Sequence, residues 1–252
     1  MTTTPRTAVV TGAAGGLGLA ITRTLLEEGH AVLALDTDHA RLDDLTQATP
    51  PGARLSLLVG DVSEEDVWLK AVQQAEGELG PVDVLVNNAG ISPKRDGVKV
   101  PGDEVSLEEW RRVLDVNLTS AFLGTRAVVP GMKSRGWGRV VNVSSQAGRT
   151  RAVIAGVAYG ASKAGMLGLT RAFAGELGPF GITVNAIAPG SIETPMMKVG
   201  SEEANRAALA KIPVRRFGQP EDMAAVVSFL IQDRAGFVNG ATIDANGGSF
   251  MA

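Results

Sequence analysis

The sequence has no cysteine at all and little histidine or aromatic content. With no cysteine among 252 residues, disulfide bonds, thiolate nucleophiles and cysteine-based metal sites are excluded. The two histidines, His30 and His39, show no pairing typical of a ligand set. We therefore expect no metal site, and we expect both imidazoles to be solvated in loops.

Long apolar runs and a strong net charge are also absent. No apolar run approaches the ~20 residues that span a bilayer, and residues 1–7 lack the apolar stretch of a signal peptide. A formal net charge of -3 gives no general attraction to nucleic acid or anionic membranes. We therefore expect a cytoplasmic protein with no nucleic-acid or membrane partner.

Short apolar runs alternate with helical patterns along the whole chain, without a linker or an internal repeat. Runs rich in Val, Ile and Leu predict strands at 7–11, 31–35, 54–59, 82–86, 139–143, 182–187 and 241–244. Such runs are typical of a parallel sheet buried on both faces. The sequence thus predicts an α/β fold: one domain, residues 1–252, with a Rossmann-type doubly wound parallel sheet of about seven strands and helices on both faces.

Helical patterns fill the segments between these strands. They cover 17–28, 106–130, 158–177, roughly 201–211 and 220–231. Ser106 with Glu109 indicates a capping box, and Ser63 with Asp66 indicates another N-cap. Right-handed crossovers place the loops after the strands along one edge of the sheet, where ligands bind in such folds.

A glycine-rich turn joins the first strand to the first helix. Gly12, Gly16 and Gly18 follow the spacing G-x-x-x-G-x-G, and Leu17 begins the helical pattern. Glycines permit a tight turn and let a pyrophosphate approach the backbone at a helix N-terminus. A turn that only packs a helix on a sheet produces the same pattern, so both interpretations stand here.

Asp36 ends the second predicted strand, where a carboxylate can accept hydrogen bonds from a ribose diol and would repel a 2′-phosphate. No arginine lies in the glycine turn or directly after Asp36. The cofactor favoured is therefore NAD rather than NADP. The alternative is an aspartate that caps the following helix.

Tyr159 is the only tyrosine of the chain, and Lys163 follows it by four positions. On a helix these positions share a face, so the phenol and the ammonium would project side by side. A cation about 5 Å from a phenolate, at an effective dielectric of ~20, is worth roughly 3 kcal/mol, or about two pKa units. Tyr159 is thus a candidate general acid/base.

Further motifs occur in a fixed order between Thr11 and Gly248. They are T-G-A-A-G-G-L-G at 11–18, D-V at 61–62, N-N-A-G at 87–90, D-V-N-L at 115–118, N-V-S-S at 142–145, Y-G-A-S-K at 159–163 and P-G-S-I-E-T at 189–194. Together these motifs resemble the classical short-chain dehydrogenase/reductase family closely, over nearly the whole chain. Motif order alone determines no substrate.

The resemblance implies a catalytic tetrad of Asn117, Ser145, Tyr159 and Lys163. Ser145 would donate to the substrate oxygen, and Tyr159 would pass the proton. Lys163 would lower the Tyr159 pKa and bind the nicotinamide ribose, and Asn117 would hold a water that links Lys163 to solvent. Taken without the family, Asn117 is a polar mid-helix residue, Ser145 a turn residue and Lys163 a solvated charge.

The resemblance also implies a dinucleotide site. Its adenine end would be held at Asp61 and Val62, and its carboxamide by Ile192 and Thr194. The full set of expected cofactor contacts is Gly12, Gly16, Leu17, Gly18, Asp36, Asp61, Val62, Asn88, Ala89, Gly90, Tyr159, Lys163, Pro189, Gly190, Ile192 and Thr194.

Three features depart from the family pattern. Ser145 and Tyr159 are fourteen positions apart where thirteen is usual. We expect one extra residue in the loop, because the strand 140–143 makes Ser145 the second serine of its pair. Asn246 stands where the family has aspartate, which affects a terminal contact and not the chemistry. Residues 92–104 form an enlarged polar loop.

Cations follow two strands near the expected pocket mouth: Lys94, Arg95, Lys99, Arg149 and Arg151. In a chain with net charge -3 they could focus an anionic substrate, such as a carboxylate, sulfonate or phosphate ester. Solvated loop charge, offset by Asp96, Asp103 and Glu104, is the alternative. A substrate lid is expected at roughly 190–215, with Met196 and Met197 as apolar lining.

The motifs and the resemblance they carry imply an NAD-dependent oxidoreductase that interconverts a secondary alcohol and a ketone. We expect a small polar or hydroxylated substrate, and the loop cations extend this expectation to an anionic one. The alternatives are reduction of a 3-oxoacyl thioester, which usually uses NADPH, and a non-catalytic dinucleotide-binding scaffold. By family resemblance we expect a homotetramer formed through helices 106–130 and 158–178. The small residues Ala161, Ala164, Gly165 and Gly168 allow such helices to approach closely.

Overall fold

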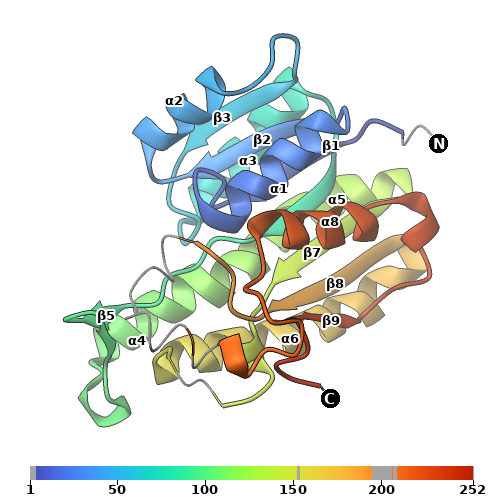
Figure 1. Ribbon diagram of the computed structural model, residues 1–252. Coiled ribbons are helices and arrows are strands. Elements are labelled where there is room, and N and C mark those ends of the chain that lie inside the picture. The colour runs from blue at the N-terminus through green and yellow to red at the C-terminus, as the bar shows by residue number, and fades with distance from the viewer. Residues whose placement is uncertain (1–3, 152–153, 195–205, 207–208, 252) are drawn as a thin grey trace.

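The parallel sheet expected from the apolar runs is present, which confirms the α/β class. The computed structural model describes residues 4–151, 154–194, 206 and 209–251. In these ranges seven strands form one sheet in the order β3-β2-β1-β4-β7-β8-β9, and every neighbouring pair is parallel (Figure 1). The strands are β1 (Thr7–Thr11), β2 (Ala31–Asp36), β3 (Leu55–Val59), β4 (Val82–Asn87), β7 (Gly138–Val143), β8 (Ile182–Pro189) and β9 (Thr242–Ala245).

Helices cover both faces of this sheet. One face carries α1 (Gly16–Glu27), α2 (His39–Gln47) and α8 (Pro220–Leu230). The other carries α3 (Glu65–Glu78), α5 (Ser120–Arg135) and α6 (Val157–Leu177), with α4 (Leu107–Leu114) leading into α5 (Figure 1). The strand order reverses between β1 and β4, and in doubly wound sheets a ligand binds at such a switch point.

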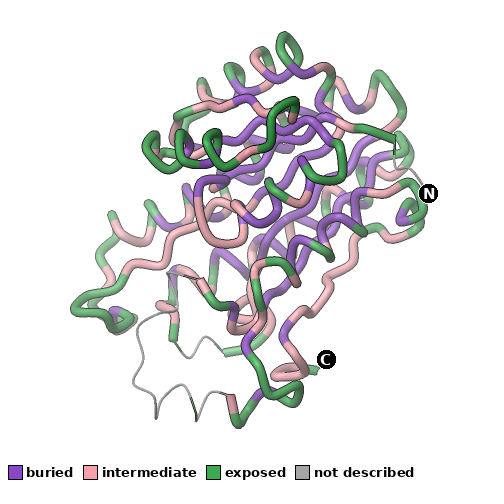
Figure 2. Tube along the Cα trace, turned by 45° about the horizontal axis from the view of Figure 1, so that its top comes forward, coloured by how far each residue is buried: buried purple, intermediate pink, exposed green. Residues whose placement is uncertain are grey.

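Two apolar layers hold the helices to the sheet. Successive residues of a strand point to opposite faces, so Val10 belongs to the apolar cluster on the side of α1, α2 and α8, while Val9 belongs to the cluster on the side of α3, α5 and α6. The central strands β1, β2, β4, β7 and β8 are buried almost throughout, as the purple centre of Figure 2 shows, whereas the edge strands β3 and β9 are only partly buried. This rigid centre positions the loops at the carboxyl edge.

The long helix predicted at 106–130 begins as expected but is not continuous. Ser106 caps it by accepting the amide hydrogen bond of Glu109. A π-helical turn, η2 (Asp115–Thr119), then separates α4 from α5, and α5 runs past Pro130 to Arg135. Asn117 lies inside that π turn.

Other local predictions were wrong. Ser63 does not cap α3, whose N-cap is Glu64, because the Ser63 hydroxyl donates to Asp61 instead. His30 is buried, and its Nδ1 accepts a hydrogen bond from the Arg6 amide, so it is not a solvated loop residue. The helix expected after Asp36 is α2, for which no range was predicted. Asp38, and not Asp36, caps it by accepting from the Arg41 amide.

The enlarged loop at 92–104 has structure of its own. It contains an antiparallel hairpin of β5 (Lys94–Arg95) and β6 (Val98–Lys99), followed by a 3-10 turn, η1 (Gly102–Glu104).

Most of the expected lid and of the helix at 201–211 lies outside the described residues, as do Met196 and Met197. Within the described ranges, no helix has the length and apolarity needed to cross a membrane. Nor do three or more His, Asp or Glu side chains of those ranges gather as metal ligands would.

Candidate active site

The glycine turn between β1 and α1 has the backbone that only glycine adopts easily. Gly12 has a φ of 62° and Gly16 one of 52°, both in the left-handed region. A Cβ at Gly18 would lie 2.0 Å from the Gly12 carbonyl oxygen, so no side chain fits there. Leu17 lies between these positions in the first turn of α1. The turn thus presents bare backbone at a helix N-terminus, which suits a pyrophosphate.

The N-N-A-G segment fastens this turn to the end of β4. The Thr11 hydroxyl accepts the amide hydrogen bonds of Asn88, at 2.9 Å, and Ala89, at 3.0 Å. The Asn88 side chain donates back to the carbonyl oxygens of Thr11 and Gly12. These hydrogen bonds join the end of β4 to the end of β1, and Thr11 takes part in them together with Asn88 and Ala89.

Asp36 does not cap the following helix, because the N-cap of α2 is Asp38. One carboxylate oxygen accepts from the Ala14 amide at 2.9 Å, and the other accepts from the amides of Thr37 and Asp38. The carboxylate is therefore held beside the glycine turn at the end of β2.

An arginine that sequence reasoning missed also lies beside this turn. A Cβ at Gly15 would be 3.3 Å from Nη1 of Arg41, which comes from α2. The Arg41 Nε pairs with Asp38 at 3.2 Å. The sequence argument looked for an arginine only in the glycine turn or directly after Asp36. Arg41 was missed because it lies in the first turn of α2, which brings its guanidinium next to the glycine turn.

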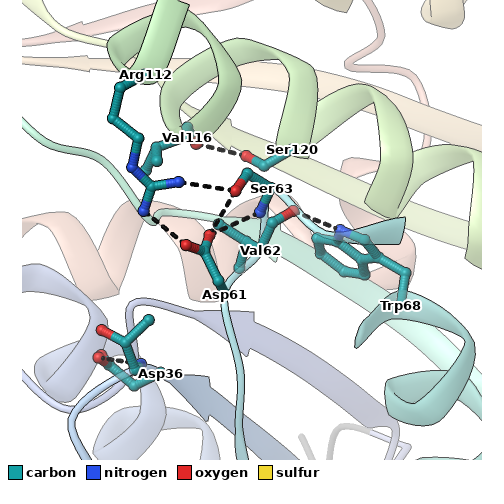
Figure 3. A network of polar contacts seen from close by, with 9 residues as sticks. Asp36, Asp61, Val62, Ser63, Trp68, Arg112, Val116 and Ser120 are labelled. Carbon is teal, nitrogen blue, oxygen red and sulfur yellow. Dashed lines mark hydrogen bonds and ion pairs between the residues drawn. The ribbon is translucent and has the colours of Figure 1, made fainter. Parts of the chain in front are cut away.

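Asp61, after β3, is held by a helix far from it in sequence. Its Oδ1 accepts from the Ser63 amide and hydroxyl, and its Oδ2 accepts from Arg112 of α4 at 2.6 Å (Figure 3). Burial alone would raise the pKa of Asp61, but the hydrogen bonds from Arg112 and Ser63 outweigh it and lower the pKa. The carboxylate therefore stays ionised and fixed in direction.

Val62 lies next to this pair and is buried. Its carbonyl oxygen accepts from the indole N–H of Trp68 at 2.9 Å (Figure 3). The backbone at the expected adenine end is therefore held by Trp68 on one side and by the Asp61–Arg112 pair on the other.

Lys163 is the centre of the candidate catalytic cluster and is not a solvated charge. It is 3% exposed, and its Nζ donates to the Val143 carbonyl oxygen, at the end of β7, at 2.7 Å. In the opposite direction, the Ser144 hydroxyl donates to the Lys163 carbonyl oxygen at 2.7 Å. Burial lowers the pKa of Lys163 to about 8.

Ser145, and not Ser144, faces the tyrosine. The Ser145 hydroxyl shares a hydrogen bond with the Tyr159 phenol and accepts from the Ala147 amide at 3.1 Å. Ser144 points instead to the backbone of α6. The geometry thus favours Ser145 as the serine of the pair, with the extra residue in the loop that follows.

The pKa of Tyr159 moves in the direction opposite to the predicted one. Burial raises it, and the hydrogen bond from Ser145 offsets this only in part. The Nζ of Lys163 is 5.7 Å from the centre of the Tyr159 ring. The sequence argument included this cation but not the cost of removing a phenolate from water. Tyr159 is therefore a neutral phenol at neutral pH, ready to donate a proton.

Asn117 completes the cluster from the π turn and is fully buried. Its amide nitrogen donates to the Ile91 carbonyl oxygen and to the Ser162 hydroxyl, and its oxygen accepts from the Ile91 amide. A Cβ at Gly90 would lie 3.4 Å from both the Asn117 oxygen and Lys163 Nζ. The bare backbone of Gly90 therefore separates these two groups. The water that the resemblance assigns to Asn117 stays a prediction.

The segment after β8 closes the site from the other side. Pro189 ends β8, and the Gly190 amide donates to Ala245 of β9. Ile192 is buried, and a Cβ at Gly16 would lie 3.6 Å from the Thr194 methyl group. Thr194 is thus next to the glycine turn, as expected of a residue that contacts the same ligand.

Asn246 makes a terminal contact, as expected of this substitution. Its side chain donates to the Phe250 carbonyl oxygen at 2.9 Å and accepts from the Gly248 amide. The side chain therefore folds the C-terminal segment and takes no part in the catalytic cluster.

The five loop cations do not converge as a group. Arg149 forms two hydrogen bonds to the Asp244 carboxylate on β9, and Arg95 pairs with Glu104 at 2.9 Å. Lys94 is exposed on the hairpin. Lys99 and Arg151 line a cavity of about 360 Å³ beside the start of α6, and the other three cations are not part of its lining.

The whole chain is similar to known reductases. A family model described as enoyl-(acyl carrier protein) reductase matches residues 12–249. An acetoacetyl-CoA reductase of Rhizobium meliloti is 42% identical over 98% of this chain and 99% of its own length. A 3-oxoacyl-[acyl-carrier-protein] reductase of Thermotoga maritima is 41% identical over 95% of this chain and 96% of its own. A Brucella melitensis 3-oxoacyl-[acyl-carrier protein] reductase with bound NAD has a TM-score of 0.89 at 39% identity, covering 98% of this chain and 92% of that one.

The buried Lys163 is expected to cost stability at neutral pH. A fall in pKa from 10.5 to about 8 corresponds to roughly 3 kcal/mol, and loss of the Val143 bond would offset about 1 kcal/mol of that. Lys163→Met should therefore unfold with a free energy about 1–2 kcal/mol higher than the parent at pH 7.

The sign of the pH dependence follows from the lowered pKa. Between pH 8 and 10.5 the unfolded chain binds more protons at this group, so the parent gains stability as pH rises and the advantage of the variant shrinks. Urea unfolding at pH 7 and pH 10 measures this, with the exposed Lys70→Met as control. A variant less stable than the parent at pH 7 would contradict the argument.

Proposed function

The chain belongs to the short-chain dehydrogenase/reductase family, and on that premise we propose that it reduces 3-oxoacyl thioesters with NADH. As a member of this family it is an oxidoreductase that interconverts alcohols and ketones. The observation that carries the proposal is the pairing of Ser145 with a neutral Tyr159, next to a buried Lys163 and beside a cavity at the carboxyl edge of the sheet. A reductase needs such a proton donor at its substrate oxygen.

The thioester replaces the small polar substrate that the sequence favoured. That preference rested partly on five converging cations, and only two of them line the cavity. The names of the relatives, an acetoacetyl-CoA reductase and a 3-oxoacyl-carrier-protein reductase, support a thioester. The main objection, the usual preference for NADPH, loses weight because a similar structure carries NAD.

In this reaction the chain positions the ketone and supplies a proton. The bound nicotinamide would supply the hydride that reaches the carbonyl carbon. The Ser145 hydroxyl donates to the ketone oxygen and stabilises its developing negative charge. Tyr159 transfers its proton to that oxygen, which gives the 3-hydroxyacyl thioester, and the Lys163 ammonium stabilises the phenolate left behind.

The cofactor would be held along the same edge. Gly12, Gly16 and Gly18 would face the pyrophosphate, and Asp36 would accept from the adenine ribose. The remaining contacts are those expected from the family: Leu17, Asp61, Val62, Asn88, Ala89, Gly90, Tyr159, Lys163, Pro189, Gly190, Ile192 and Thr194. The positive φ of Gly12 and Gly16 and the fixed Asp36 carboxylate support this fit.

The first test is turnover of acetoacetyl-CoA, followed by NADH absorbance. We expect reduction by the parent and a kcat about 10³-fold lower in Tyr159→Phe, because the proton donor is lost. NADH affinity, measured by fluorescence titration, should be unchanged in that variant. Oxidation of sugars, polyols or hydroxy acids without any thioester turnover would refute the proposal.

We also infer that Asp36 excludes NADPH although a cation for the 2′-phosphate is present. The carboxylate would repel the phosphate, while Arg41 lies against Gly15 of the same turn. Asp36→Asn should therefore lower KM for NADPH about tenfold, and adding Arg41→Gln should remove most of that gain. Arg41→Gln alone should leave KM for NADH unchanged. A parent enzyme with a lower KM for NADPH than for NADH would contradict this.

We propose further that the chain forms a homotetramer through the α5–α6 face. An apolar groove of about 400 Å³ lies there, lined by Leu118, Thr119, Phe122, Gly165, Gly168, Leu169 and Ala172. Within the described residues, nothing lies within 4 Å of a Cβ at Gly168 or at Gly77 of α3. Gly168→Lys should therefore fold but dissociate the tetramer, while Gly77→Lys should not. Sedimentation velocity measures both, and a monomeric parent at micromolar concentration would contradict the proposal.

A further inference from the structure

We propose that Lys99 and Arg151 bind the phosphate of the 4′-phosphopantetheine arm that carries the acyl group. The inference rests on the thioester function proposed above and adds a substrate contact to it. It concerns the cavity of about 360 Å³ between the enlarged loop, the segment after β7 and the start of α6.

The cavity adjoins the groups that handle the proton. Ala147, in its wall, donates its amide hydrogen bond to Ser145 Oγ, and Gly160, also in the wall, directly follows Tyr159. The cavity is therefore next to the place where a ketone would meet Ser145 and Tyr159, and the rest of such a substrate would fit into it.

The walls suit an amide-containing aliphatic arm. Val100, Pro101, Ala155 and Val157 contribute apolar surface, and Gly102 and Gly156 contribute bare backbone. Most of these residues belong to the enlarged loop or to the approach to α6. The insertion at 92–104 thus builds one side of the cavity.

The charged side chains that line the cavity are both cationic. Lys99 and Arg151 line the cavity, and no acidic residue of the described ranges does. Arg149 and Arg95, which the sequence placed in the same group, are neutralised by Asp244 and Glu104. Arg151 is exposed and forms no ion pair within the described residues.

A phosphate is the anion that matches this arrangement. The pantetheine arm is uncharged between its thioester and its phosphate, so the phosphate is the group of the arm that two cations can bind. Arginine and lysine are the side chains that bind phosphate best. Coenzyme A and acyl carrier proteins share this phosphate, so the contact serves either source.

The experiment compares acetoacetyl thioesters that differ in the phosphate alone. Acetoacetyl-pantetheine and acetoacetyl-4′-phosphopantetheine are reduced by the parent, by Lys99→Gln/Arg151→Gln and by the control Arg95→Gln, which lies outside the cavity. We expect KM about five- to tenfold lower for the phosphorylated ester in the parent and in the control. The double variant should have equal KM for both esters, with kcat unchanged. Salt should weaken the preference of the parent.

The outcomes separate the two proposals. Turnover of both esters with equal KM in the parent, or an unchanged KM ratio in the double variant, overturns the phosphate site and leaves the thioester function standing. No turnover of any thioester overturns both. Acetoacetyl-CoA and an acetoacetyl carrier protein, assayed with the same variants, identify the source: the double variant should raise KM for the one that delivers the phosphate to this cavity.

Discussion

Two reciprocal hydrogen bonds between the end of β7 and α6 hold the candidate catalytic side chains in place. Lys163 Nζ donates to the Val143 carbonyl oxygen, and the Ser144 hydroxyl donates to the Lys163 carbonyl oxygen. The first bond buries an ammonium and the second fixes the helix that carries it. Since Tyr159 lies one turn earlier on the same helix, both bonds also position its phenol against Ser145. Burial fixes the position of the Lys163 side chain, and the same burial lowers its pKa.

Much of the fold could be predicted because each strand and most helices are local patterns. The apolar runs predicted the seven parallel strands, and the cap at Ser106 marked the start of α4. The glycine turn and the Tyr159–Lys163 spacing were equally readable, since both depend on residues a few positions apart. Because all strands of a parallel sheet end at the same edge, the motifs that follow them are expected to lie near one another there.

What the sequence did not predict are contacts between distant residues. Arg112 reaches Asp61 from 51 positions away, and Arg149 binds Asp244 from 95. Arg41 is near Gly15 only because α2 forms, and that helix has a weak pattern. The direction of the Tyr159 pKa was missed for a similar reason: burial depends on the whole fold and opposes the attraction of the nearby cation.

The π-helical turn at Asp115–Thr119 makes this region sensitive to length rather than to composition. A π turn holds one residue more than an α turn, so the turn rotates everything after it by about 100° relative to a regular helix. Removing any one residue there would restore regular winding and carry the amide of Asn117 away from the backbone of Ile91. A deletion of one residue would therefore break the hydrogen bonds between Asn117 and Ile91. Substitutions at the exposed Thr119 leave the winding intact.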